Sequence, residues 1–262
     1  MIQPEAIAVL GDVHANLAAF EAVLEATRGV DAYVFLGDYV GYGPQPREVL
    51  ALARELVAGH RWWSVIGNHD RYALAGEHSW DGVEVTSGGE WEAWTSEQLS
   101  AQDRAFLEAL PGALTVELPG TSGASVTAHV EHNLPGAHRY LRPGTPEHEI
   151  APLVSRREAE LFLFGHSHVV IDRTVAGKRI INPGSVGQPR DGCPDAAYAL
   201  WRPAGVTFHR LAYDVERTVR ALEAMPMSRE QTALWARNLR QGIVLAASRP
   251  DLQADGPVQL SE

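Results

Sequence analysis

The sequence contains a single cysteine, Cys193, and no run of about 18 apolar residues of the kind that spans a membrane. One cysteine cannot form an internal disulfide, and no apolar segment has the features of a signal peptide. Neither a secreted nor a membrane-spanning protein is therefore expected, and no membrane partner. A reducing cytoplasm fits this composition best.

Basic residues are also scarce. The chain has 22 Lys and Arg against 33 Asp and Glu, a formal net charge of -11. A surface this acidic repels polyanions at long range, so binding of duplex nucleic acid is not expected. A metal site could still carry the opposite charge. Two divalent ions held by two carboxylates and neutral ligands would give the site a net charge of about +2, or about +1 with a bridging hydroxide. Such a positive site attracts phosphate esters.

The 262 residues suffice for one large domain. We expect a single catalytic domain over residues 1–247, with a lid or cap at about 71–111 and C-terminal helices at about 214–242. The tail, 248–262, is polar with two prolines and is predicted to be loosely ordered. Nothing in the sequence specifies an oligomeric state.

Apolar, β-prone runs alternate with helical patterns in the first half of the chain. Runs at 7–10, 33–36 and 62–66 are separated by segments whose apolar residues recur at helical spacing, 17–24 and 49–57. This βαβαβ order predicts a parallel sheet. Residues 76–94, rich in Gly, Ser, Trp and acidic residues, predict a loop or lid. A short helix with a capping-box pattern, Ser100 to Asp103, follows it.

The second half of the chain predicts mainly strands. A hairpin turn is expected at Ala176-Gly177, and helices at 214–225 and 228–240. The predicted strands cover residues 114–118, 125–128, 161–164, 169–175, 179–181, 197–201 and 206–211.

Five polar clusters stand out, and four of them directly follow a strand-like run. In open α/β sheets, ligands bind beyond the carboxyl ends of strands, so these side chains are expected to meet there. Two clusters contain ligand types two residues apart, which point to one side of an extended chain and can reach one ion. Mixed imidazole and carboxylate ligands suit Mn, Fe, Zn or Ni better than Mg or Ca. The clusters are Gly11-Asp12-Val13-His14, Gly37-Asp38, Gly67-Asn68-His69-Asp70, Thr127-Ala128-His129 and Gly165-His166-Ser167-His168.

The order of these clusters resembles the calcineurin-like metallophosphoesterase superfamily. The likeness spans residues 11–168 and continues in Asn182-Pro183-Gly184-Ser185-Val186-Gly187. The sequence of residues 37–44 resembles that of the bacterial branch described as diadenosine tetraphosphatase-like. The resemblance implies an α/β fold, a four-layer α/β/β/α sandwich of two packed mixed sheets flanked by helices, with the site at one edge.

The resemblance also implies a catalytic centre with two transition-metal ions. A hydroxide bridging the ions would attack phosphorus in line. His69 matches the family's catalytic histidine, which either stabilises charge on the phosphoryl oxygens or protonates the leaving group. The implied ligands are Asp12, His14 and His168 for the first ion, Asn68, His129 and His166 for the second, and Asp38 as the bridge.

Several other side chains have two interpretations. Arg190 either contacts substrate phosphate or pairs with Asp191 at the surface. Tyr42 either stacks on a base or covers its loop. For the tryptophans at 80, 91 and 94, core or cap packing is favoured over an aromatic wall for a nucleobase. The histidines at 132, 138 and 148 lie in a segment rich in Pro and Gly and are expected to be solvated.

Three classes of function are compatible with these motifs. The favoured one is a dinuclear phosphoesterase that hydrolyses a small-molecule phosphate ester or nucleotide, specifically a phosphodiester or a dinucleoside polyphosphate. The alternative is a protein Ser/Thr phosphatase or phosphomonoesterase. Protein phosphatases carry Asp-Arg-Gly where this sequence has Gly41-Tyr42-Gly43, so an acidic partner of the catalytic histidine and a phosphate-binding arginine are missing. A non-catalytic scaffold, like the retromer subunit, predicts a damaged ligand set, which this sequence does not have.

Overall fold

The computed structural model describes residues 4–76, 79–80, 83–84, 89–134 and 140–244. The first half of the chain alternates strands with helices. Its elements are β1 (Ile7–Leu10), α1 (Leu17–Thr27), β2 (Ala32–Phe35), α2 (Pro46–Gly59), β3 (Arg61–Ser64), α3 (Asn68–Ala75), β4 (Ser79–Trp80), β5 (Val83–Glu84), α4 (Gly89–Gln98) and α5 (Ala101–Glu108).

The second half is richer in strands and ends in two helices. Its elements are β6 (Ala113–Pro119), a 3-10 turn (Thr121–Gly123), β7 (Ser125–Glu131), α6 (Glu147–Val154), β8 (Leu161–Leu163), β9 (Val170–Val175), β10 (Lys178–Pro183), β11 (Ala196–Arg202), β12 (Gly205–Leu211), α7 (Val215–Glu223) and α8 (Arg229–Gln241).

The first sheet has the strand order β12-β11-β1-β2-β3. Strands β1, β2 and β3 are parallel, as the βαβαβ pattern predicts, whereas β11 and β12 join antiparallel. Helices α1 and α2, which connect the parallel strands, bury Phe20 and Leu50 in one apolar cluster with Phe35 of β2. This packing covers the outer face of the sheet.

The second sheet has the order β6-β7-β8-β10-β9. Strands β7, β8 and β10 are parallel, and β6 and β9 pair antiparallel at the two edges. The predicted hairpin between β9 and β10 is present. Its central residues, Ala176 (φ 49°) and Gly177 (φ 74°), have the positive φ values that two-residue hairpin turns require.

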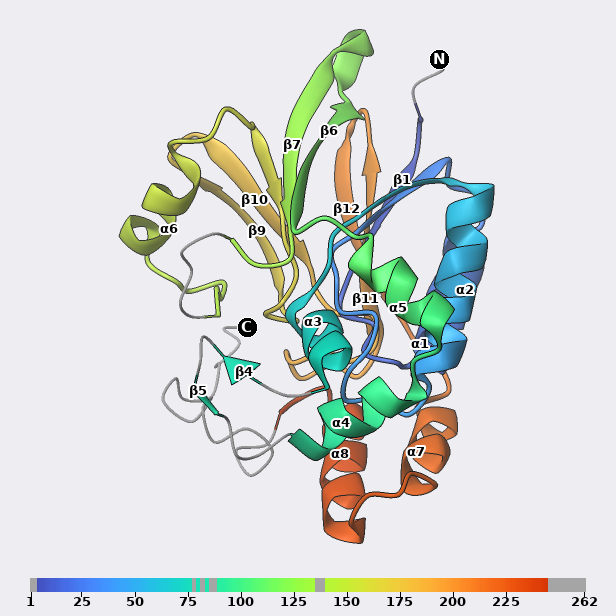
Figure 1. Ribbon diagram of the computed structural model, residues 1–262. Coiled ribbons are helices and arrows are strands. Elements are labelled where there is room, and N and C mark those ends of the chain that lie inside the picture. The colour runs from blue at the N-terminus through green and yellow to red at the C-terminus, as the bar shows by residue number, and fades with distance from the viewer. Residues whose placement is uncertain (1–3, 77–78, 81–82, 85–88, 135–139, 245–262) are drawn as a thin grey trace.

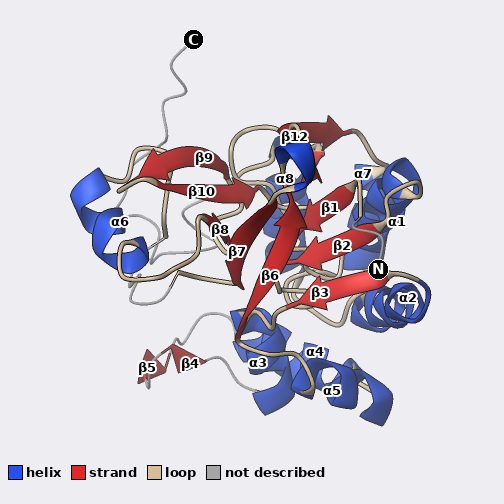
Figure 2. Ribbon diagram, turned by 90° about the horizontal axis from the view of Figure 1, so that it is seen from above, coloured by secondary structure: helices blue, strands red, loops and turns tan. Residues whose placement is uncertain are grey.

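The two sheets pack face to face. Val9 and Val34 of the first sheet and Val130 and Leu163 of the second lie in one buried cluster. On the far side, α6 packs its Ile150 against the outer face of the second sheet. Figures 1 and 2 show the resulting order of layers, with α1 and α2 at one side and α6 at the other. The predicted α/β/β/α sandwich is confirmed.

The predicted loop at 76–94 is helical where it overlaps α4. This helix has no separate apolar stripe in the sequence, because Glu92 and Thr95 are buried along with Trp91. Trp91 packs on Trp235 of α8, with 5.9 Å between ring centroids, so core packing is the role of this tryptophan. Residues 77–78, 81–82, 85–88 and the predicted tail at 248–262 lie outside the described residues.

The two C-terminal helices lie close to their predicted positions. Asp214 caps α7 by accepting a hydrogen bond from the Arg217 amide at 2.9 Å, and Ser228 caps α8 by accepting one from the Gln231 amide at 3.2 Å. No helix in the part of the chain that the structure describes is long and apolar enough to cross a membrane.

Candidate metal centre

The polar clusters leave the sheets through unusual backbone. Asp12, His14 and Asp38 have φ values of 54°, 48° and 57°, and His166 and His168 have 68° and 59°. This left-handed conformation costs a non-glycine residue on the order of 1 to 3 kcal/mol. Hydrogen bonds between the loops hold it: the Asp12 amide donates to the Gly37 carbonyl and the His14 amide to the Asp38 carbonyl, both at 3.0 Å. The side chains converge as a result.

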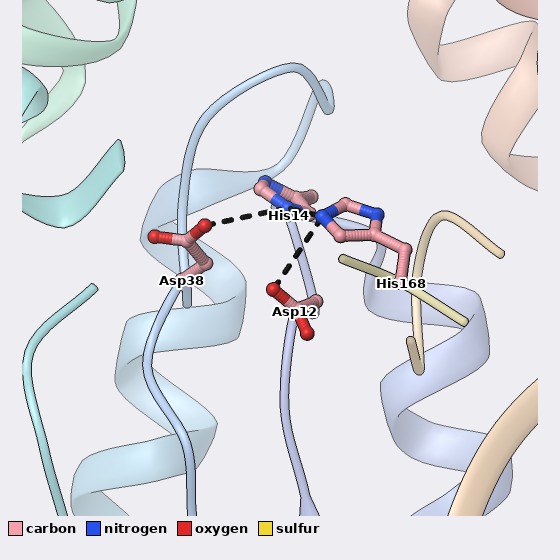
Figure 3. Close-up of side chains that lie close together, drawn as sticks. All are labelled: Asp12, His14, Asp38 and His168. Atoms are coloured by element: carbon pink, nitrogen blue, oxygen red, sulfur yellow. Dashed lines mark hydrogen bonds and ion pairs between the residues drawn. The ribbon is translucent and has the colours of Figure 1, made fainter. Parts of the chain in front are cut away.

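Four of them form the first buried group, Asp12, His14, Asp38 and His168, whose ligand atoms lie within 4.8 Å of one another. Figure 3 shows the two imidazoles facing the two carboxylates. His14 Nε2 lies 3.6 Å from Asp38 Oδ2, and His168 Nε2 lies 3.4 Å from Asp12 Oδ1. The Nδ1 atoms of His14 and His168 face backbone carbonyls at 3.2 and 2.7 Å. Such contacts fix the ring orientation, so both Nε2 atoms point to the centre of the group.

A second group lies on the other side of Asp38. Asn68 Oδ1 is 2.9 Å from both His132 Nε2 and His166 Nδ1, and His132 Nε2 is 3.2 Å from Asp38 Oδ2. The other nitrogen of His132, Nδ1, lies 2.7 Å from the Leu36 carbonyl. Asp38 thus borders both groups, the position expected of a bridging carboxylate.

The prediction of His129 as a ligand is wrong. Strand β7 extends to Glu131, so His129 lies within the strand rather than after it. Its neighbours in the strand, Ala128 and Val130, face the inner core, so its own side chain points to the opposite face. There His129 contacts Glu131 at 2.9 Å, Arg157 at 2.8 Å and the ring of Phe162.

His132 takes the place predicted for His129, and its prediction as a solvated residue is also wrong. The residue is 5% exposed and follows the end of β7, as the other side chains of the two groups follow their strands. A correct strand end would have identified it. Of the other two loop histidines, His148 is exposed, although it lies in α6, and His138 lies outside the described residues.

Burial sets the charge states in the centre. It lowers the pKa of His14, His166 and His168 well below the usual value, so these imidazoles are neutral, the form that binds metals. For Asp38, burial acts to raise the pKa, but His132, His69 and His14 outweigh it and keep this carboxylate ionised. In turn, Asp38 raises the pKa of His132 above its usual value despite burial, so cation binding there has to displace a proton.

The residues fit a bound cation. Asp12 is fully buried, and burial raises its pKa to about 7. Its Oδ2 atom receives no hydrogen bond from any residue that the structure describes. A buried carboxylate oxygen without a donor is costly, and a metal ion removes that cost. The donors, neutral imidazoles with carboxylates and an amide, suit transition metals.

His69 lies beside the two groups. Its backbone amide donates to Asp38 Oδ1 at 2.9 Å, and its ring centroid is 5.1 Å from that of His14. The Tyr42 ring packs on His69, His14 and Trp235 at 4.2, 4.9 and 4.7 Å and is 7% exposed. Tyr42 therefore covers its loop, and its faces are not open to a base.

Arg190 does not pair with Asp191, because Asp191 forms its ion pair with Arg210. The Arg190 guanidinium lies 5.9 Å from the ring centroids of both Tyr42 and Tyr140. One of its nitrogens donates to Gln188 at 2.9 Å, while Nε is buried without a partner among the described residues. Tyr140, which the sequence did not single out, stacks on the His166 ring at 4.4 Å and 5°.

Comparison with known proteins agrees with this geometry. The family model of the calcineurin-like phosphoesterase superfamily domain matches residues 6–202. An uncharacterized protein of Methanocaldococcus jannaschii is 32% identical over 227 residues, which cover 80% of this chain and 89% of that protein. The crystal structure of a metallophosphoesterase from Sphaerobacter thermophilus is 31% identical, with a TM-score of 0.70, over 92% of this chain and 100% of that one. The crystal structure of a hypothetical protein from Pyrococcus horikoshii, 21% identical, has the same fold, with a TM-score of 0.77 over 92% of this chain and 99% of that one.

Proposed function

Because this chain belongs to the calcineurin-like phosphoesterase superfamily and is a metallophosphoesterase, we propose that it hydrolyses phosphodiesters or dinucleoside polyphosphates with two metal ions. The observation that carries the proposal is the pair of buried ligand groups on either side of Asp38. Asp12, His14 and His168 would hold one ion, and Asn68, His132 and His166 the other. Asp38 would contact both.

The ions would stabilise the phosphoryl oxygens as Lewis acids and make a water molecule acidic enough to serve as the nucleophile at neutral pH. The protein residues would orient the metal ligands and assist proton transfer. Hydrogen bonds from backbone amides to Asp12 Oδ1 and Asp38 Oδ1, at 3.0 and 2.9 Å, fix the two carboxylates. His69, beside Asp38, would donate a hydrogen bond to the phosphoryl group or a proton to the departing oxygen.

Arg190 supports a phosphate-binding role. Its guanidinium lies 5.9 Å from the ring centroids of Tyr42 and Tyr140, which contact ligand histidines, and its Nε has no partner among the described residues. It lowers the pKa of His14, His166 and His168, although less than burial does. An Arg fork matches the oxygens of a phosphate group.

A diester or dinucleotide is favoured over a phosphoprotein by the charge around the centre. Gly41 and Gly43 offer no side chain, and Tyr42 is covered, so Arg190 is the cation that we assign to substrate beside the metals. A singly charged reacting phosphoryl group needs fewer cations than a dianionic monoester.

The test is a hydrolysis panel with Mn-loaded protein. It compares kcat/KM for diadenosine tetraphosphate and an aryl phosphodiester with that for an aryl monoester and a phosphoserine peptide, with metal-stripped protein as the control. We expect the first two substrates to be turned over most efficiently. If the phosphopeptide exceeds both, the enzyme is a protein phosphatase, and full activity of the stripped protein would contradict metal catalysis.

A further inference from the structure

We propose that Glu92 of α4 is the positioning residue of His69, holding Nδ1 so that Nε2 faces the substrate. This inference rests on the catalytic role proposed for His69. Glu92 Oε1 lies 3.6 Å from His69 Nδ1, and the two side chains are 2% and 5% exposed. No sequence motif contains Glu92, because α4 is distant in sequence from every metal-ligand cluster.

The loop after β2 has no room to provide this carboxylate. A Cβ atom on Gly41 would lie 2.8 Å from His69 Cβ and 2.9 Å from His69 Nδ1, and Gly41 has a φ of +89°. Both the space and the backbone therefore exclude a side chain at this position. A carboxylate can reach Nδ1 from another element, and α4 supplies it.

The His69 ring has a fixed orientation. Tyr42 packs on it at 4.2 Å, and Tyr72 and His14 meet it edge-on at 5.4 and 5.1 Å. In a neutral imidazole, a carboxylate at Nδ1 selects the tautomer with the proton on that nitrogen. The opposite nitrogen, Nε2, is then the atom that takes up and gives up a proton: it accepts in the neutral ring and donates to substrate in the imidazolium form, while Nδ1–H stays directed at Glu92. Contacts of this kind are often longer than a hydrogen bond before substrate binds.

The position of Glu92 supports this role over simple packing. It lies on the face of α4 that also buries Trp91 and Thr95, where an acidic side chain is costly. Leucine or glutamine would fill that volume without a buried charge. A charge at this point is explained by the imidazole that it faces.

The variant Glu92→Gln tests the proposal, with Glu97→Gln, on the exposed side of the same helix, as the matched control. With Mn-loaded protein and phosphodiesters of poor and good leaving groups, we expect Glu92→Gln to lower kcat by roughly 10- to 100-fold, part of the 10² to 10⁴ that a positioned acid contributes. KM and metal content should not change. Glu97→Gln should match the unmodified protein.

The double variant separates positioning from packing. In the His69→Ala background, Glu92→Gln should cause no further loss of kcat. Two results would overturn the role of Glu92 and leave the proposed function intact. One is an equal loss of kcat from Glu92→Gln in both backgrounds. The other is an unchanged kcat in Glu92→Gln when His69→Ala lowers kcat. No loss from His69→Ala would overturn the role of His69 and with it that of Glu92.

A measurement on the unsubstituted chain covers the case in which Glu92→Gln does not fold. Long-range ¹H–¹⁵N spectra of the Zn-loaded protein report which nitrogen of each imidazole carries the proton. We expect the Nδ1–H tautomer for neutral His69. The Nε2–H tautomer would contradict the proposal.

Discussion

Asp12 and Asp38 each divide their two carboxylate oxygens between the backbone and the metal centre. Oδ1 of Asp12 accepts from the His166 amide, and Oδ1 of Asp38 accepts from the His69 amide. Oδ2 of Asp12 is buried without a hydrogen bond from the described residues, and Oδ2 of Asp38 faces His132 Nε2 at 3.2 Å. Each aspartate therefore fixes a neighbouring loop while keeping one oxygen for a cation. Asparagine at either position would keep the hydrogen bond from the backbone amide but would lose the negative charge that binds a cation.

The exchange of His129 for His132 gives a direct prediction. His132→Ala should remove one of the two metal equivalents and lower kcat/KM by at least about 100-fold, since even partners of metal ligands contribute roughly that much. His129→Ala should retain both metals and near-normal activity, because its contacts are with Glu131 and Arg157. Elemental analysis and diester hydrolysis measure both effects. Metal loss in the His129 variant alone would restore the sequence-based assignment.

His69 gives a second prediction at this scale. His69→Ala should keep its metal content and lose roughly 10² to 10⁴ in kcat, because the residue acts on substrate beside the ligands. The loss should shrink with nitrophenol as the leaving group, which needs no proton. Loss of metal in this variant would make His69 a ligand instead.

At the level of elements, the accuracy of the sequence reading depends on how clearly each element ends. Strands β1 and β2 are short apolar runs followed by glycine, so the sequence predicts that Asp12 and Asp38 follow these strands, and the structure has them there. Strand β7 has no such stop: it continues through His129 to Glu131, and the sequence reading ended it three residues early. Helix α4 is not predicted from the sequence, because its buried face contains Glu92 and Thr95 beside Trp91 and so forms no apolar stripe. Partners such as Tyr140 depend on three-dimensional contacts that no local pattern shows.

The start of α5 allows a prediction about pH. The Ser100 amide and hydroxyl donate to Asp103 Oδ2 at 2.9 and 2.6 Å, and Arg54 pairs with the same carboxylate. Burial acts to raise the pKa of Asp103, but these bonds outweigh it and leave the pKa below its ordinary value. The ionised form thus stabilises the fold above the unfolded pKa of about 4, and this stability is lost as the pH falls through the lower native pKa.

We therefore expect Asp103→Asn to reduce the free energy of unfolding by about 1 kcal/mol at pH 7, the usual value of a helix cap. The difference from the unmodified protein should narrow as the pH falls below about 4. Urea unfolding across this range measures it, with Glu108→Gln, exposed on the same helix, as the control. A difference independent of pH would mean that the charge of Asp103 contributes nothing.

At the scale of the whole molecule, the metal centre joins distant parts of the chain. Its residues run from Asp12 to His168 and follow strands of both sheets. The unfolded chain cannot bring them together. Metal binding should therefore favour the folded state over the unfolded one.

Removal of metal should lower the melting temperature. At a free metal concentration 100 times Kd, the bound ion contributes about 2.7 kcal/mol. For a chain of this size, this corresponds to a shift of roughly 5 to 10 °C. Thermal unfolding after chelation, and again after added Mn, measures the shift. Identical melting curves would contradict a link between metal and fold, and the His132→Ala variant should show a smaller shift.

The hydrogen bond from the His166 amide to Asp12 has a consequence for motion. Asp12 follows β1 of the first sheet, and His166 follows β8 of the second, so this bond crosses from one sheet to the other. Its proton can exchange with solvent deuterium only when the bond opens, and opening it requires the two loops to separate. When reclosing is faster than exchange, the exchange rate of this amide measures the fraction of molecules in which the two loops have separated. A cation held between Asp12 and His168 should slow this hydrogen exchange. The His166 amide therefore reports the opening of the contact between the loops of the two sheets.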